Sequence, residues 1–199
     1  MSEGDHFEQE LKFRIQDLQG FNEALQVLGP ALQTVHQVNH YFAADGPAPS
    51  FGWSLRLRQK DSDFELTLKM NRRFVEGFFE ADEVNVAIEP GLAQRLLGSP
   101  EWDESIWQLA PLTRLRSEFG VARLKLLGSS KNVRHRCPSR SWGTPELDIT
   151  SFPDGSTDYE LEVETTVPQE VLADLKSIEA LLQVQDKTKY RRFLERLPS

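Results

Sequence analysis

Charged and apolar residues alternate in several segments of this chain. Between His6 and Ile15 the charged residues Glu8, Glu10 and Lys12 occupy every second position, and apolar residues fill most of the positions between them. Because successive side chains of a β-strand point to opposite faces, this segment predicts a strand with one charged and one apolar face. The same period of two recurs at 55–60, 64–69 and 159–164. The sequence therefore predicts a sheet with a strongly charged face.

Helical spacing and turn residues divide the rest of the chain. Apolar residues at helical spacing predict a helix over Leu18–Leu28, which Gly29 and Pro30 end. Loop composition over Ala44–Pro49 and the run Pro153–Gly155 predict turns between strands. Further helices are expected at 90–109, 168–182 and 188–197. Strands are expected near 6–16, 33–43, 52–60, 63–70, 74–87, 112–127, 131–137, 145–152 and 157–166. Without repeats or a linker, one domain over 1–199 is the simplest organisation.

Composition narrows the function classes. The net charge of −8 argues against a general nucleic-acid binder, because surfaces that follow a phosphate backbone need an excess of basic residues. Cys137 is the single cysteine, so no internal disulfide can form and a reducing compartment is expected. The sequence has no apolar signal segment and no run of about 18 apolar residues. We therefore expect a cytoplasmic protein without a membrane partner.

The charges on the alternating segments differ in sign from one segment to the next. A single charged strand face is usually a solvated surface, and a buried salt-bridge network is a second structural explanation. If the strands close into a barrel, however, acidic and basic faces meet across its interior. The acids on these segments are Glu8, Glu10, Asp148, Glu160 and Glu162, and the bases are Arg56, Arg58, Lys69, Arg114, Arg116, Arg134 and Arg136.

Such a combination suits phosphoryl chemistry. A triphosphate is a polyanion, so Arg and Lys must hold its oxygens, and the forked Arg guanidinium matches phosphate geometry. Carboxylates are the ligands that magnesium and manganese prefer, and these ions can neutralise phosphate charge and activate water. Neither the bases alone nor the carboxylates alone can both hold the phosphates and bind the ions that activate water.

The order of these motifs resembles the CYTH superfamily of triphosphate tunnel metalloenzymes. The opening motif Glu-x-Glu-x-Lys is formed by Glu8, Glu10 and Lys12. The resemblance continues through 55–58, 66–69, 113–116 and 147–148, and through Glu160 and Glu162, which follow Asp148 by twelve and fourteen residues. Segments 39–42 and 188–193 are similar to the bacterial branch. One departure is that Tyr41-Phe42 is followed by two alanines rather than by an acidic residue.

This resemblance implies an α+β fold, an eight-stranded antiparallel β-barrel that forms a tunnel, with helices packed outside. It implies a small-molecule triphosphate as partner and Mg²⁺ or Mn²⁺ as cofactor. Motif by motif, Glu8, Glu10, Asp148, Glu160 and Glu162 would bind metal, and Glu8, Glu10, Lys12, Glu160 and Glu162 would be catalytic. The phosphates would be held by Lys12, Arg56, Arg58, Lys69 and Arg116, and also by Arg114, Arg134, Arg136 and Lys189, which depend on strand parity or on the terminal motif. Glu80 and Glu83 match acidic positions of the middle strand, and their orientation is open.

Two classes of function follow. The first is a metal-dependent triphosphatase acting on inorganic triphosphate, with thiamine triphosphate, a nucleotide or a cyclase reaction in the same tunnel as alternatives. The second is a non-catalytic module that binds polyphosphate. The full acidic set favours catalysis, because a binder would need the bases more than Glu160 and Glu162. No nucleoside-recognition motif is evident, so inorganic triphosphate is the preferred substrate. Oligomeric state cannot be inferred from these residues.

Overall fold

The computed structural model describes residues 4–45, 52–75, 77–98 and 101–198, so most of the predicted loop Ala44–Pro49 lies outside the described residues. The strands are β1 (Gly4–Ile15), β2 (Gln33–Ala44), β3 (Trp53–Lys60), β4 (Asp63–Val75), β5 (Phe78–Ile88), β6 (Leu124–Arg136), β7 (Pro145–Ser151), β8 (Thr157–Glu164) and β9 (Leu182–Val184). The helices are α1 (Leu18–Leu28), α2 (Pro90–Gly98), α3 (Glu104–Trp107), α4 (Ala110–Phe119), α5 (Pro168–Asp174), the 3₁₀ helix η1 (Leu175–Leu181) and α6 (Lys189–Glu195).

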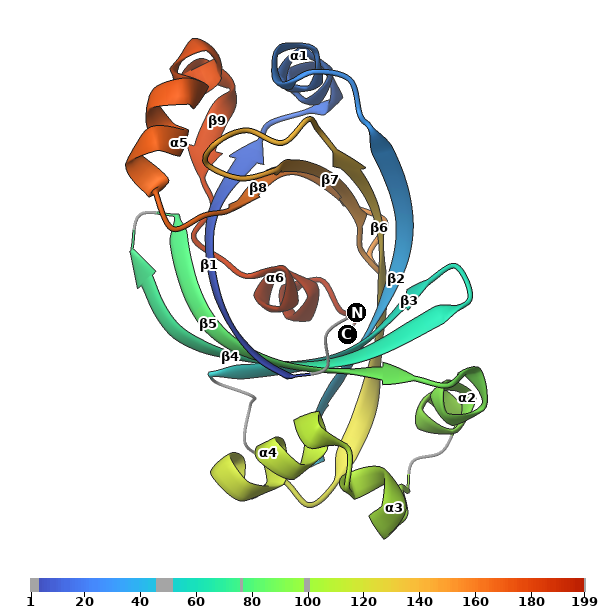
Figure 1. Ribbon diagram of the computed structural model, residues 1–199. Helices are drawn as coiled ribbons and strands as arrows, with labels where there is room; N and C mark the ends of the chain where they lie inside the picture. Colours follow the sequence, from blue (N-terminus) through green and yellow to red (C-terminus); the bar gives the residue numbers. More distant parts are fainter. Residues whose placement is uncertain (1–3, 46–51, 76, 99–100, 199) are drawn as a thin grey trace. The chain divides into compact units, whose positions relative to one another are not determined.

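The strands form one sheet in the order β5-β4-β3-β2-β6-β7-β8-β1-β9, and β5 also pairs with β1 (Figure 1). This additional pairing closes the sheet, so eight strands form an antiparallel barrel and β9 is attached to β1 alone. The predicted fold class is confirmed. Most element boundaries predicted from the alternation and from turn residues lie within a few residues of those observed.

The chain divides into two compact units, and each has its own hydrophobic core. Unit 1 comprises Met1–Phe7, Gln37–Arg72 and Ala81–Ser129. Its core joins the apolar face of β3 and β4, with Leu55, Leu57 and Leu66 fully buried, to residues of α2, α3 and α4. Because apolar residues take alternate positions along these strands, the polar residues between them face the other side. Unit 1 therefore presents Arg56, Arg58, Thr67 and Lys69 on the face that its helices do not cover.

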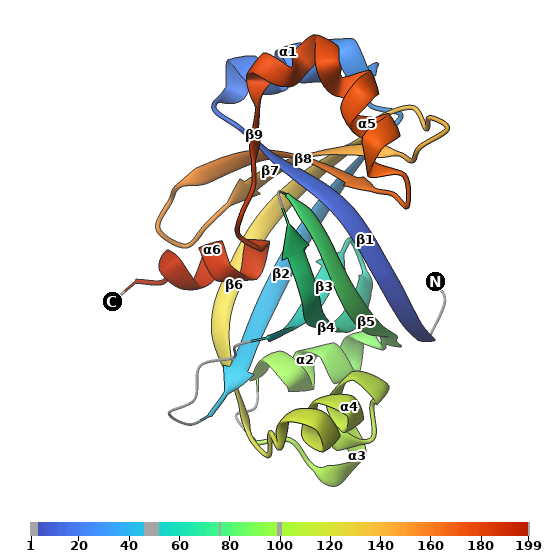
Figure 2. The same ribbon diagram turned by 90° about the vertical axis from the view of Figure 1, so that its left-hand side faces the viewer.

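Unit 2 comprises Glu8–His36, Arg73–Glu80 and Ser130–Ser199. Its core joins the apolar positions of β1, β7 and β8 to α1, α5 and η1. Figure 2 shows α1 and α5 on one side of β7 and β8, and α6 on the other side. Helix α6 thus packs against the charged face of these strands, a placement that the sequence did not predict.

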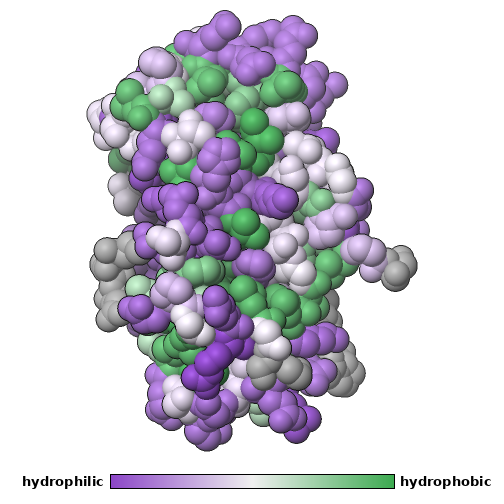
Figure 3. Space-filling model, turned by 90° about the vertical axis from the view of Figure 1, so that its right-hand side faces the viewer, coloured by the Kyte–Doolittle hydropathy of each residue, from purple (hydrophilic) through white to green (hydrophobic). Residues whose placement is uncertain are grey.

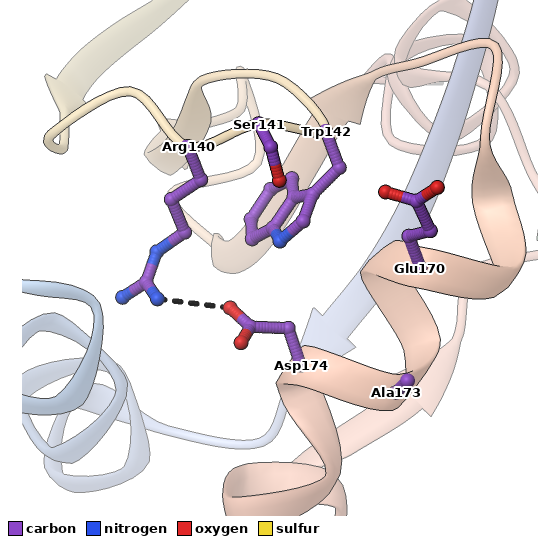
Figure 4. Close-up of a pocket in the computed structure, with 6 residues that line it drawn as sticks. All are labelled: Arg140, Ser141, Trp142, Glu170, Ala173 and Asp174. Carbon is purple, nitrogen blue, oxygen red and sulfur yellow. Dashed lines mark hydrogen bonds and ion pairs between the residues drawn. The ribbon is translucent and has the colours of Figure 1, made fainter.

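A tight hairpin between β6 and β7 connects this core to two helices. Arg140 and Gly143 exchange backbone hydrogen bonds of 2.8 and 3.2 Å. The Arg140 guanidinium donates to the Asp174 carboxylate of α5 at 2.8 Å and to carbonyls at the end of α1. Figure 4 shows this ion pair beside an open hollow lined by Arg140, Ser141, Trp142, Glu170, Ala173 and Asp174. Arg140 therefore ties the hairpin to α1 and α5.

Several predicted elements are wrong. The strand expected near 112–127 begins only at Leu124 and is continuous with the strand expected at 131–137, so both belong to β6, while residues 110–119 form α4. Pro111 near its start and Gly120 at its end, with a left-handed φ of 66°, are ordinary helix boundaries. In addition, the helix expected over 168–182 is divided into α5 and η1, after which the chain forms the edge strand β9. Leu112 and Leu115 are three positions apart, as in a helix, whereas Arg114, Leu115 and Arg116 alternate as in a strand.

Hydrophilic residues predominate on the face drawn in Figure 3, with separate hydrophobic areas between them. Within the part of the chain that the structure describes, no helix combines the length and the apolar character needed to span a bilayer.

Candidate active site

The acidic residues of unit 2 lie side by side because of the strand register. Asp148 of β7 is opposite Glu160 of β8, and Glu146 is opposite Glu162. Glu162 is in turn opposite Lys12 of β1, two residues after Glu10. All these residues occupy the alternate positions of their strands whose side chains point away from the apolar core. Asp148 and Glu160 are fully buried, and Glu10 and Glu162 are nearly so. The register thus assembles a buried acidic cluster from three strands.

Lys12 lies within this cluster. Its ammonium is 2.9 Å from a carboxylate oxygen of Glu10 and 2.9 Å from one of Glu162. Burial alone would lower the pKa of Lys12, but the charges of Glu10, Glu162 and Glu8 raise it well above its ordinary value. Glu8 is half-buried on the same face of β1. Lys12 is therefore a fixed positive charge throughout the physiological pH range.

Arg134 of β6 binds three carboxylates. It is opposite Asp148 in the register and donates to both oxygens of that carboxylate, at 2.8 and 2.6 Å. The same guanidinium lies 2.5 Å from Glu162 and also pairs with Glu146. Burial alone would raise the pKa of Asp148, but Arg134 and Lys189 lower it to about 2. Burial likewise opposes ionisation of Glu162, yet Lys12, Lys189 and Arg134 keep its pKa well below the usual range.

Lys189, the first residue of α6, is contributed to the cluster by a helix and not by a strand. Its ammonium lies 2.5 Å from Asp148, 3.1 Å from Glu162 and 3.6 Å from Glu160. Thr188 caps the helix by accepting a hydrogen bond from the Arg191 amide at 3.2 Å. Although burial would lower the pKa of Lys189, the charges of Asp148 and Glu162 raise it. One cationic atom is thus shared by three buried carboxylates.

Unit 1 carries a second, more basic set on β2, β3, β4 and β5. Arg58 donates to the Asn39 side chain at 3.3 Å and lies 4.0 Å from Glu65. Lys69 is 3.4 Å from Glu83, which shows that Glu83 points to the charged face. Glu80 has the opposite strand parity and accepts a hydrogen bond from Gln9. Glu83 and Glu80, whose orientations the sequence left open, therefore point to opposite faces of β5.

Arg56 is distinctive within this basic set. Its register partners are Tyr41 and Thr67, neither of which carries a negative charge. Its Nε is buried and has no hydrogen-bond partner among the described residues. A buried guanidinium nitrogen without a partner is costly unless a ligand satisfies it. Arg56 is therefore the strongest candidate in unit 1 for binding an anion.

Three of the predicted bases lie outside these sets or at an exposed edge of them. Arg114 and Arg116 lie on α4, where Arg114 pairs with Glu118 and Arg116 binds both oxygens of Glu104. Arg114 was assigned by strand parity, which does not apply on a helix, and Arg116, assigned from the motif at 113–116, lies on the same helix. Arg136 is on β6 but half exposed, and its contact is with Glu146 at 2.8 Å.

Sequence reasoning missed several residues of the unit 2 network. Glu146 and Asp158 each precede a predicted acid by two positions, so the strand period of two already placed them on the charged face. Arg192 follows Lys189 by three positions, and helical spacing places both on the same side of α6. Arg192 lies 2.6 Å from Glu160 and 2.8 Å from Asp158.

The chemistry of the acidic cluster fits magnesium or manganese, because both ions favour carboxylate oxygens. Among the described residues, no three acidic, histidine or cysteine side chains are arranged as ligands of one ion. The carboxylates instead surround ammonium and guanidinium groups. Asp148, Glu160 and Glu162 could hold an ion where they now share the ammonium of Lys189.

Several solved structures are similar to this chain over nearly its whole length. HpAC1 from Hippeastrum, a proposed adenylyl cyclase described as having a dominant triphosphatase activity, is 27% identical with a TM-score of 0.84, over 94% of this chain and 95% of that chain. A proposed adenylate cyclase from Bacillus halodurans is 26% identical with a TM-score of 0.72, over 96% of this chain and 98% of that chain. The PH1012 protein of Pyrococcus horikoshii, 19% identical with a TM-score of 0.56 over 96% of this chain and 99% of that one, shares the fold.

No curated protein sequence matches the chain. The CYTH domain matches residues 6–194, a range that includes both charged sets and all strands except the first residues of β1. The chain belongs to the CYTH domain family.

Proposed function

We propose that this protein hydrolyses a phosphoanhydride bond of a triphosphate with the help of a divalent metal ion. The observation that carries the proposal is the convergence of Asp148, Glu160 and Glu162 on one cationic atom, the ammonium of Lys189. Burying three carboxylates is costly unless cations compensate them, so the cluster is built to hold positive charge. Membership of the CYTH family and the triphosphatase activity described for HpAC1 support this proposal.

Each charged set has a role in this proposal. Asp148, Glu160 and Glu162, with Glu8 and Glu10, would hold Mg²⁺ or Mn²⁺. A bound ion supplies charge neutralisation for the phosphates and lowers the pKa of a water molecule. Lys12 and Lys189 would contact phosphate oxygens and stabilise negative charge as the bond to the leaving phosphate breaks.

The basic set of unit 1 is the second candidate for binding phosphate. Arg56, Arg58 and Lys69 would donate to phosphate oxygens, and Arg56 would gain the partner that its buried Nε lacks. A triphosphate matches this demand for many acceptors better than a monophosphate does. Among triphosphates we favour inorganic triphosphate, because it needs no pocket for a base or a thiazole ring and the sequence has no evident nucleoside-recognition motif. Thiamine triphosphate and nucleotides are the alternative substrates.

The test is release of phosphate and pyrophosphate from tripolyphosphate, thiamine triphosphate and ATP, each with magnesium, manganese or chelator. The purified chain is compared with Glu10→Gln and with the surface control Glu118→Gln, which lies on α4. We expect metal-dependent phosphate release, greatest with tripolyphosphate, that Glu10→Gln lowers at least 100-fold and the control leaves intact. Pyrophosphate release from ATP alone would indicate a cyclase. Tight binding of tripolyphosphate without turnover would refute hydrolysis and identify a polyphosphate-binding module.

A further inference from the structure

Asp158 on β8 connects the sheet to α6 through both of its carboxylate oxygens. One oxygen accepts a hydrogen bond from Arg192 at 2.8 Å, and the other accepts one from Arg196 at 2.9 Å. Asp158 and Arg192 are both nearly buried, with 6% and 4% of their surface exposed. Ion pairs at this depth are screened little by solvent, so their geometry is better defined than that of surface pairs.

An aromatic ring completes this contact. The guanidinium of Arg196 lies 4.2 Å from the centre of the Phe152 ring, and that of Arg192 lies 6.0 Å from it. Phe152 is itself buried, in the turn that joins β7 to β8. Both arginines are thus held between a carboxylate and an aromatic face. We call Asp158, Phe152, Arg192 and Arg196 the α6 anchor.

Helix α6 needs such an anchor. It has seven residues, and an isolated helix of this length is not stable in water. Its position therefore depends on contacts with the strands. Arg192 and Lys189 lie one turn apart, and Lys189 is the residue that reaches Asp148 and Glu162. The anchor consequently determines where the ammonium of Lys189 lies in the acidic cluster.

We propose that Asp158 is a positioning residue for the triphosphatase reaction: it holds α6 so that Lys189 reaches the acidic cluster. This inference rests on the proposed function, in which Lys189 contacts substrate. Asp158 itself touches neither the substrate nor the ion in this scheme. It acts through Arg192 and Arg196, unlike Glu160 and Glu162, whose carboxylates lie in the cluster.

The first test measures the position of α6 without reference to activity. Hydrogen exchange of the amides in 189–195 is followed by mass spectrometry in the unsubstituted protein, in Asp158→Asn and in Arg196→Gln. The control is Asp174→Asn, which removes a more exposed ion pair of the same unit, with Arg140. We expect exchange in α6 to become roughly tenfold faster in Asp158→Asn, less so in Arg196→Gln, and to be unchanged in the control. Unchanged exchange in both anchor variants would overturn the proposal.

The second test separates positioning from general stability by a double-mutant cycle. Asp158→Asn, Lys189→Gln and the double variant are compared for the KM of tripolyphosphate and for kcat. We expect roughly a tenfold rise in KM for each single variant and no further rise in the double variant, because Asp158 acts through Lys189. Additive effects would show a role independent of Lys189 and overturn the proposal. If the unsubstituted protein hydrolyses no triphosphate, the proposed function fails, and binding of tripolyphosphate by calorimetry replaces KM in the same cycle.

Discussion

Substitution of Arg134 by glutamine should destabilise unit 2 strongly, because this guanidinium compensates three carboxylates at once. Arg134 donates to both oxygens of Asp148, lies 2.5 Å from Glu162 and pairs with Glu146. Removing one partner of a buried ion pair typically costs about 3–5 kcal/mol. Two features place the expected cost of Arg134→Gln at the lower end of this range. Its side chain is 16% exposed, and Lys12 and Lys189 still compensate the remaining acids. We expect a loss of about 3 kcal/mol in the free energy of unfolding.

A matched control lies two residues further along the same strand. Arg136 is 51% exposed and pairs with Glu146 at 2.8 Å, so Arg136→Gln should cost less than about 1 kcal/mol. The free energy of unfolding is measured by urea titration at neutral pH with a chelator present, and the thermal midpoint by circular dichroism. For a chain of this size, about 3 kcal/mol corresponds to a midpoint lower by roughly 6–12 °C. Equal losses in Arg134→Gln and Arg136→Gln would refute the reasoning, because burial and the number of carboxylates would then not matter.

The same variants give a second measurement that depends on pH. Arg134 is the main charge that lowers the pKa of Asp148 to about 2. Without Arg134 this pKa should rise, so the variant takes up a proton at a higher pH than the unsubstituted protein does. The difference in stability between the two proteins should therefore shrink as the pH falls from about 4 towards 2. A difference that stays constant over this range would show that Arg134 does not compensate Asp148.

Three further predictions follow from single contacts. Gly143→Ala should cost about 3 kcal/mol in urea unfolding, because φ is +137° and a Cβ would lie 2.5 Å from the Glu164 carbonyl oxygen; a loss below about 1 kcal/mol would contradict the observed turn. Lowering the pKa of Asp148 from 3.8 to about 2 stabilises the fold above pH 4. The stability that Asp148→Asn removes should therefore reach about 2 kcal/mol near neutral pH and vanish as the pH falls below about 2 in acid titrations. Arg56→Gln should raise the KM for tripolyphosphate about tenfold without lowering the thermal midpoint, because its Nε has no hydrogen-bond partner among the described residues; a large loss of stability would assign Arg56 a structural role.

The alternation of charged and apolar residues was sufficient to predict the face of the sheet on which the acids lie. In β1, β7 and β8 each predicted acid alternates with a core residue such as Leu11, Leu147 or Leu161. A shift of one residue would bury the charges in the apolar core, so the pattern determines the face without knowledge of the pairing. Which acids become neighbours depends instead on the register, for example Asp148 opposite Glu160. The sequence alone does not specify that register.

The errors arose where two periodicities were both compatible with the residues. Leu112 and Leu115 are three positions apart, as in a helix, while Arg114, Leu115 and Arg116 alternate as in a strand. Pro111 and Gly120 were the better signals, because they mark the first turn and the end of α4. Both units also contain contacts between elements that are distant in the sequence. The contact of Lys189 with Asp148 spans 41 residues, and no local pattern could predict it.

Helix α6 changes how the acidic cluster should be understood. A sheet that brought Asp148, Glu160 and Glu162 together without cations would be destabilised by repulsion and by loss of hydration. Arg134 and Lys12 are contributed by neighbouring strands and stay in place whenever the sheet is formed. Lys189 is different, because it is contributed by a short helix that depends on its anchor. Of Arg134, Lys12 and Lys189, it can therefore be displaced at the lowest cost, so a divalent ion that enters should exchange with Lys189 before it disturbs Arg134 or Lys12.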